Sequence, residues 1–198
     1  MSFPRFAILA VLFAMCMGRT LRAQVEAPAH AAAAPIVDNA FVQKQFGSTC
    51  SLVGLDPLKG DLDSDGVEDI VIPAHCTNPM MDQVEDNFVV VDPYNGFFGY
   101  GNPKVTTQFA SENPERRGYT LLVIHGSGEE AWHSATPKAK FLIVNLPFKQ
   151  VVVKKLAIKK KKPVLGIFAE ETGGDEATSV IFWDGKKYRY QPLGSALN

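Results

Sequence analysis

Acidic residues stand at alternate positions in the segment GDLDSDGVED, residues 60–69. Aspartates occupy the first, third, fifth and ninth positions of a loop that begins at Asp61, and Gly66 at the sixth position allows a sharp turn. A chain that wraps oxygen ligands around Ca²⁺ uses this spacing. Negative charges so close together repel one another, and a divalent cation would relieve the repulsion. The predicted calcium ligands are the side chains of Asp61, Asp63, Asp65 and Asp69 and the backbone carbonyl of Val67.

The residues that follow this loop distinguish it from an EF-hand. Its twelfth position is Ile72, where an EF-hand has a bidentate glutamate, and the run Ile-Val-Ile at 70–72 predicts a strand. A calcium loop that leads into a strand resembles the FG-GAP or VCBS type of calcium-blade repeat, found in integrin alpha subunits and many exported bacterial proteins. Phe46-Gly47 and Ile72-Pro73-Ala74 stand where such a repeat has its Phe-Gly and Gly-Ala-Pro.

This resemblance covers about 29 residues and is strongest over residues 61–72. It implies a propeller-blade-like β structure in which calcium stabilises the fold and does no chemistry. Residues 50–59 lengthen the spacing between Phe-Gly and the first aspartate, and the sequence has no second DxDxDG. Because a propeller needs several blades, a closed propeller is not expected. We expect one calcium-loop blade within a small sheet or sandwich; assembly of blades between chains is the alternative.

The hydrophobic pattern predicts a mainly β domain with one short N-terminal helix. Apolar residues recur at helical spacing between Asp38, a suitable N-cap, and Gly47, a suitable stop. An antiparallel-dominated sheet or sandwich should follow, and the dipeptide Asp184-Gly185 predicts a two-residue type I′ hairpin turn. The β-branched and aromatic runs that predict strands lie at residues 70–72, 88–91, 119–124, 141–144, 150–153, 164–168, 179–183 and 187–190.

Residues 92–118 form a long connection that is rich in glycine, proline and asparagine. Such a segment is uncommon in a compact domain unless it covers or binds something. Its aromatic residues could stack on a ligand such as a sugar ring, but covering the apolar face of the sheet is the favoured interpretation. These aromatic residues are Tyr94, Phe97, Phe98 and Tyr100.

The N-terminus has the three parts of a secretory signal peptide. Arg5 precedes twelve apolar residues at 6–17, and a short segment then leads to a predicted cleavage site after Ala23. The apolar run is shorter than the roughly 20 residues of a membrane-spanning helix, so no span is expected in the mature chain. Lipidation at Cys16 remains an alternative. The predicted organisation is therefore a signal peptide at 1–23, a disordered Ala/Pro-rich leader at 24–35, and one calcium-loop β domain at 36–198, secreted or periplasmic.

Removal of the signal peptide changes both the cysteine count and the charge. Cys50 and Cys76 remain as an even pair in an oxidising compartment, which predicts a disulfide. Closing that loop would contribute about 3–4 kcal/mol in the chain-entropy treatment. The full chain has 20 basic and 21 acidic residues; three basic residues leave with the signal, so the mature charge is 17 minus 21, or −4. A net charge of −1 for the full chain, or −4 for the mature chain, does not suit a protein that binds nucleic acid through a basic surface.

Two other groups of residues could do chemistry. The segment His125-Gly126-Ser127-Gly128 resembles the oxyanion loop of α/β hydrolases, but the sequence lacks a GxSxG nucleophile and any histidine after His133. A small secreted hydrolase is therefore the alternative function, and an enzyme is not expected. Zinc binding has little support because the histidines of this sequence do not occur in the HxxxH spacing of zinc sites. The residues in question are His75, His125 and His133, with Glu129 or Glu130.

A run of lysines between Lys154 and Lys162 is the main cluster of like charge. It could contact a polyanion of the cell envelope, although lysines at a strand end more often keep the edge soluble. The sequence as a whole predicts an exported calcium-binding β domain with a structural or binding role and no catalysis. Its partner is not identified, and an extracellular or envelope protein or a polysaccharide is the expected kind.

Overall fold

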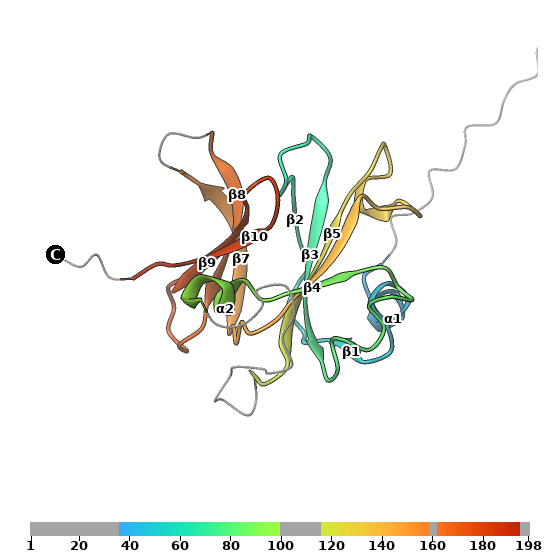
Figure 1. Ribbon diagram of the computed structural model, residues 1–198, viewed down its shortest axis with the longest axis horizontal. Helices are drawn as coiled ribbons and strands as arrows, with labels where there is room; N and C mark the ends of the chain where they lie inside the picture. The colour runs from blue at the N-terminus through green and yellow to red at the C-terminus, as the bar shows by residue number, and fades with distance from the viewer. Residues whose placement is uncertain (1–35, 100–115, 159–161, 195–198) are drawn as a thin grey trace, which may run out of the picture. The chain divides into compact units, whose positions relative to one another are not determined.

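The computed structural model describes residues 36–99, 116–158 and 162–194, which belong to one compact unit. The predicted signal peptide and leader lie outside the described residues. Two β-sheets form most of the structure, with the orange to red strands of the second sheet to the left of β3 and β5 in Figure 1. The prediction of a mainly β, antiparallel-dominated fold is confirmed. None of the helices in the described part of the chain is long and apolar enough to cross a membrane.

The first sheet has six strands in the order β1-β3-β5-β6-β4, and β2 also pairs with β3. All neighbours are antiparallel except β4 and β6, which are parallel. The central strand β3 is buried on both faces, which explains its nearly continuous run of apolar residues. The strands are β1 (Cys50–Leu52), β2 (Leu58–Gly60), β3 (Asp69–Cys76), β4 (Val89–Val91), β5 (Tyr119–His125) and β6 (Ala139–Ile143).

The second sheet is a meander of four antiparallel strands in the order β10-β9-β8-β7. Sequential strands are separated by only four to eight residues, and such short separations favour pairing of neighbours in the chain. Lys154 and Lys155 lie on β7, an edge strand of this sheet, while residues 159–161 of the lysine run are outside the described residues. The strands are β7 (Gln150–Leu156), β8 (Val164–Glu170), β9 (Ser179–Trp183) and β10 (Tyr188–Pro192).

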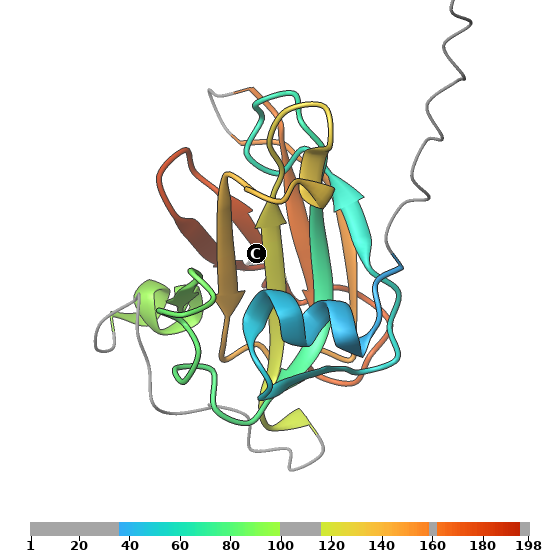
Figure 2. The same cartoon turned by 90° about the vertical axis from the view of Figure 1, so that its right-hand side faces the viewer.

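Helix α1 (Asn39–Phe46) begins and ends where the sequence predicts. The carboxylate of Asp38 accepts a hydrogen bond from the backbone N–H of Phe41, and Gly47 follows the last residue with a φ of 88°. Val42 and Phe46 are fully buried against one face of the first sheet, which Figure 2 shows behind the blue helix. The other face packs against the second sheet through a core that includes Val71 and Ile167. The fold is therefore sandwich-like, with a helix on the outer face of one sheet.

The predicted disulfide between Cys50 and Cys76 is present, and it joins directly paired residues of β1 and β3. Three details of the sequence-based fold were wrong. Strands β1 and β2 were not predicted, since each has only three residues and its apolar content is low. A second helix, α2 (Pro93–Phe98), lies in the segment predicted as a connection; Asp92 caps it, and Pro93 suits its first position.

The third difference is the turn between β9 and β10. The hairpin is present, but Trp183 pairs with Tyr188, so the turn has four residues instead of two. The carboxylate of Asp184 accepts hydrogen bonds from the backbone N–H groups of Lys186 and Lys187, which stabilises the longer turn. Gly185 has a φ of 97°, whereas Asp184 is not among the described residues with positive φ.

Candidate functional site: an aspartate loop on the first sheet

The aspartate loop, residues 61–68, connects the paired strands β2 and β3. Gly60 pairs with Asp69 at its base, so the hairpin fixes both ends of the loop. Two turn residues have positive φ, Gly66 at 89° and Ser64 at 62°. These conformations bend the chain back on itself, so that alternate side chains point to one side.

The loop brings the carboxylates of Asp61, Asp63 and Asp65 together, with one oxygen of each within 4.8 Å of the others. The same carboxylates fix the loop by accepting backbone hydrogen bonds. Asp61 accepts from Asp65 and Gly66, at 3.0 Å each, and Asp65 accepts from Val67 at 2.9 Å. The backbone N–H of Asp65 is also within 3.2 Å of Asp63 Oδ1. This cluster of hard oxygen donors could hold a metal ion.

The predicted ligand Asp69 lies apart from this group of three carboxylates. It is fully buried at the start of β3, where its two oxygens accept hydrogen bonds from the backbone of Leu62 at 2.7 Å and of Gly126 at 2.8 Å. Burial raises the pKa of Asp69 to about 6, although the two backbone hydrogen bonds lower it in part. Asp69 thus ties both the loop and the β5–β6 connection to β3, and its role as a ligand stays a prediction, as does that of the Val67 carbonyl.

A lysine from the connection between β5 and β6 reaches into the aspartate loop. Lys138 Nζ lies 2.6 Å from Asp63 Oδ2 and 2.6 Å from Asp65 Oδ2. Its hydrogen bonds to Asp63 and Asp65 raise the pKa of Lys138 well above its ordinary value, and the same contact lowers the pKa of Asp65. The side chain of Asp63 is only 3% exposed, whereas that of Lys138 is 48% exposed. The ammonium group therefore neutralises carboxylates from the solvent side of the loop.

A second polar contact holds Asp63 from inside the sandwich. Asp63 Oδ2 is 3.3 Å from His125 Nδ1 at the end of β5, and His125 Nε2 is 2.7 Å from the hydroxyl of Tyr188 on β10. Burial lowers the pKa of His125, although the charge of the nearby Asp63 acts in the opposite direction. The lowered pKa favours the neutral ring. Because a carboxylate only accepts, Nδ1 carries the proton and Nε2 accepts from Tyr188. The network links the aspartate loop to the second sheet.

The segment that resembles a hydrolase loop packs against the aspartate loop. A side chain on Gly126 would meet three backbone atoms, the closest being Glu68 O at 2.4 Å from its Cβ, so glycine is needed there. Ser127 Oγ bonds with Thr136 O at 2.7 Å, and His133 Nδ1 lies 3.1 Å from Glu130 O. Among the described hydrogen bonds, none joins Ser127 to His133.

The candidate zinc ligands do not form a cluster in the described part of the chain. The Asp61, Asp63 and Asp65 group is the one set of three metal-ligating side chains found there. His75 and His125 lie near opposite ends of the paired strands β3 and β5. The ring of His133 packs on Trp132, with centroids 3.6 Å apart.

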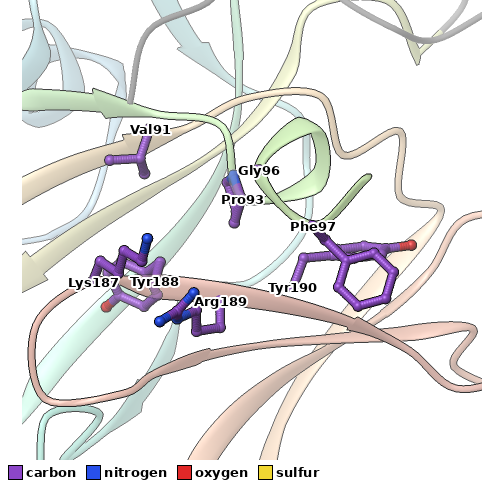
Figure 3. A pocket seen from close by; sticks show the side chains of 8 residues that line it. All are labelled: Val91, Pro93, Gly96, Phe97, Lys187, Tyr188, Arg189 and Tyr190. Atoms are coloured by element: carbon purple, nitrogen blue, oxygen red, sulfur yellow. The ribbon is translucent and has the colours of Figure 1, made fainter. Parts of the chain in front are cut away.

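Phe97 of α2 lines a small pocket beside β10. Figure 3 shows Phe97 next to Tyr190, with Arg189 on the strand and Lys187 in the turn just before it. The rings of Tyr94, Phe97 and Phe98 all contact Tyr190, so they cover the sandwich edge, while Tyr100 lies outside the described residues. The cavity is about 100 Å³. Ligand pockets usually measure roughly 300–1,000 Å³, so this cavity is smaller than a typical small-molecule site.

No model of a protein family matches this sequence, and no curated protein or solved structure is significantly similar to it.

Sequence reasoning identified the aspartates of the loop but missed the residues that complete the site. Lys138 lies 75 residues from Asp63, and Tyr188 lies 63 residues from His125. Local spacing carries no signal for contacts at such separations. The sequence indicated a hydrolase-like role for residues 125–126, whereas in the structure their neighbours are the aspartate loop and Tyr188.

Proposed function

We propose that this protein is an exported calcium-binding β domain in which the ion stabilises the fold without catalysis. The observation that carries the proposal is the convergence of the Asp61, Asp63 and Asp65 carboxylates within 4.8 Å. An all-oxygen set of carboxylates suits Ca²⁺ better than zinc or copper, which favour nitrogen and sulfur. The resemblance of the loop to FG-GAP or VCBS calcium blades supports the same ion.

The role assigned to calcium is to neutralise the loop and to join its carboxylates. Bound there, the ion would offset repulsion between three aspartates and add to the hydrogen bonds that already close the hairpin. A non-catalytic function is supported by the contacts of the hydrolase-like residues. His125 is engaged with Asp63 and Tyr188, and Ser127 is bonded to Thr136.

Export to the periplasm or the cell exterior is part of the proposal. The Cys50–Cys76 disulfide supports it, because disulfides persist in oxidising compartments. The signal-like sequence at residues 1–23 supports it independently. Extracellular calcium modules bind at roughly 10⁻⁴–10⁻³ M, so a weak site would still be filled there. The proposed partner is an extracellular or envelope protein or a polysaccharide.

Thermal unfolding in calcium and in chelator, at equal ionic strength, tests the proposal. Calcium at 100 times its dissociation constant should stabilise the folded state by about 2.7 kcal/mol. For a domain of this size, the melting temperature should then rise by about 5–10 °C. Magnesium at the same concentration should give a smaller shift, because it prefers a compact octahedral site.

A matched pair of variants locates the effect. Asp61→Asn removes a carboxylate from the loop and should abolish most of the calcium-dependent shift. Asp175→Asn makes the same charge change at a fully exposed side chain and should keep it. Equal melting temperatures of the wild type in calcium and in chelator would refute the proposed function.

A further inference from the structure

The ammonium group of Lys138 stands where a loop of this kind holds a cation. Its distances of 2.6 Å to Asp63 Oδ2 and to Asp65 Oδ2 are close to the 2.3–2.6 Å of calcium–oxygen bonds. A metal ion that used these two oxygens would come into contact with Nζ. Two positive charges in contact repel one another, and the carboxylate oxygens can face only one of them closely. The ammonium and the metal ion therefore compete for one place.

From this geometry we propose that Lys138 is a tethered cation that fills the aspartate loop without metal and that a metal ion must displace. The inference rests on the proposed function, because it concerns the regulation of the same site. Displacement is sterically open: the side chain of Lys138 is 48% exposed and can turn into solvent. Only its side chain needs to move, since its backbone N–H bonds to His125 O at 3.0 Å.

The remaining contacts keep the loop in place when the lysine leaves. Asp63 stays held by His125, and the backbone N–H groups of Asp65 and Val67 still bond to carboxylates. The site is thus preorganised in both states, and the lysine changes mainly its affinity. Metal binding would be weakened by the free energy of the Lys138 contacts, and in the metal-free protein the ammonium would neutralise one of the three negative charges of the loop. Calcium binding would also add one solvated ammonium group to the surface beside the loop.

Calcium titration calorimetry on four chelator-stripped proteins tests the inference: wild type, Lys138→Met, Lys138→Arg and Lys186→Met. Lys138→Met should bind calcium on the order of tenfold more tightly than the wild type, as expected for loss of a coupled competitor. Lys138→Arg keeps the charge and should bind as weakly as the wild type. Lys186→Met makes the same charge change in the β9–β10 turn and should also match the wild type. If Lys138→Met does not fold, Lys138→Gln replaces it.

The outcomes separate this inference from the proposed function. Tighter binding by Lys138→Met alone supports both. Binding by Lys138→Met but not by the wild type supports the tethered cation and refutes calcium binding by the natural chain. Equal affinities in the wild type and Lys138→Met overturn the inference and leave the proposed function standing. Absence of binding in all four proteins overturns both.

Discussion

Two turns of this molecule concentrate carboxylate oxygens, and they neutralise them by different means. In the aspartate loop, Asp63 and Asp65 face the ammonium of Lys138. In the turn after β8, residues 170–175, Glu170 Oε1 accepts the backbone N–H groups of Thr172, Gly173 and Gly174 and the hydroxyl of Thr172, at 2.7–3.0 Å. One loop depends on a cation, whereas the other depends on fixed dipoles of its own backbone.

Each turn has a lysine beside it, and the two lysines donate hydrogen bonds to different kinds of oxygen. Lys149 Nζ bonds to the carbonyls of Gly173 and Gly174, at 3.2 and 3.1 Å, and lies 3.9 Å from Asp175 Oδ1; none of its described contacts is with the carboxylate of Glu170. The hydrogen bonds of Glu170 all reach Oε1, and its Oε2 is buried without a hydrogen-bond partner among the described atoms, whereas the Oδ2 atoms of Asp63 and Asp65 both face the ammonium of Lys138. A carboxylate oxygen left over by its turn is therefore not enough for a cation site; a cation must also be able to reach it, as the half-exposed Lys138 reaches the aspartate loop.

The largest expected effect comes from breaking the turn that needs no cation. Glu170→Ala leaves several N–H groups without an acceptor in a turn whose glutamate is 1% exposed, and should cost about 2–3 kcal/mol. Urea unfolding measures this loss, which should be the same in calcium and in chelator. Asp175→Ala in the same turn should change stability by less than about 0.5 kcal/mol. A calcium-dependent loss in Glu170→Ala would contradict the contrast between the two turns.

The second largest effect is expected from a substitution at Gly126, whose backbone packs against the aspartate loop. Gly126→Ala places a Cβ against backbone atoms of Glu68, Ala131 and Trp132, and should cost about 2 kcal/mol. The calcium-induced rise in melting temperature should shrink as well, because Gly126 N–H is one of the two donors that hold Asp69.

Gly128→Ala is the matched control for this variant. A Cβ added at Gly128 would have no atom within 4 Å. The left-handed backbone, with a φ of 62°, should by itself lower the stability of the alanine variant by about 1 kcal/mol without changing its calcium response. Differential scanning calorimetry in both conditions compares the two variants. Equal losses would show that the close approach at Gly126 does not support the loop.

A smaller effect is expected from the pH dependence of the stability that Glu170 contributes. Burial alone would raise the pKa of Glu170, but hydrogen bonds from Thr172 and the two glycines outweigh it, and the net shift lies below the ordinary 4.5. Stability from this group is therefore present above about pH 4.5 and is lost as pH falls through the folded-state pKa. Glu170→Gln should cost about 1 kcal/mol at pH 7, and its deficit against the wild type should shrink in acid. A deficit that is constant from pH 7 to pH 3 would contradict this.

The smallest effect is expected at the solvent side of the aspartate loop. In chelator, Asp65→Asn should lower stability by less than about 1 kcal/mol, because Lys138 is half exposed and water screens the pair. The same variant should lose most of its calcium-dependent stabilisation. Melting curves at low and high salt, with and without calcium, provide the measurement. A loss larger than that of Glu170→Ala in chelator would reverse the ranking of the two turns.

Much of the fold could be predicted from local sequence. Short runs of β-branched and aromatic residues located eight strands of the two sheets, and the capping residues Asp38 and Gly47 located α1. The three-residue strands β1 and β2 were missed because they have too few residues to show a period. The turn at Asp184-Gly185 was given the wrong length because its side-chain hydrogen bonds outweighed the dipeptide preference.

By itself the sequence determined that the carboxylates of Asp61, Asp63 and Asp65 gather in one loop and that Cys50 and Cys76 pair, because a short turn and a cysteine count depend on few residues; it also predicted Asp69 as a ligand, which lies apart from the three. Only the tertiary structure decided what those oxygens meet. Pairing of β5 with β3 and β6 brings His125, Gly126 and Lys138 to the loop, and packing of the second sheet adds Tyr188. The physical reason is that charge compensation depends on distance in space, and sheet register, not sequence separation, sets the distance between a carboxylate and its cation.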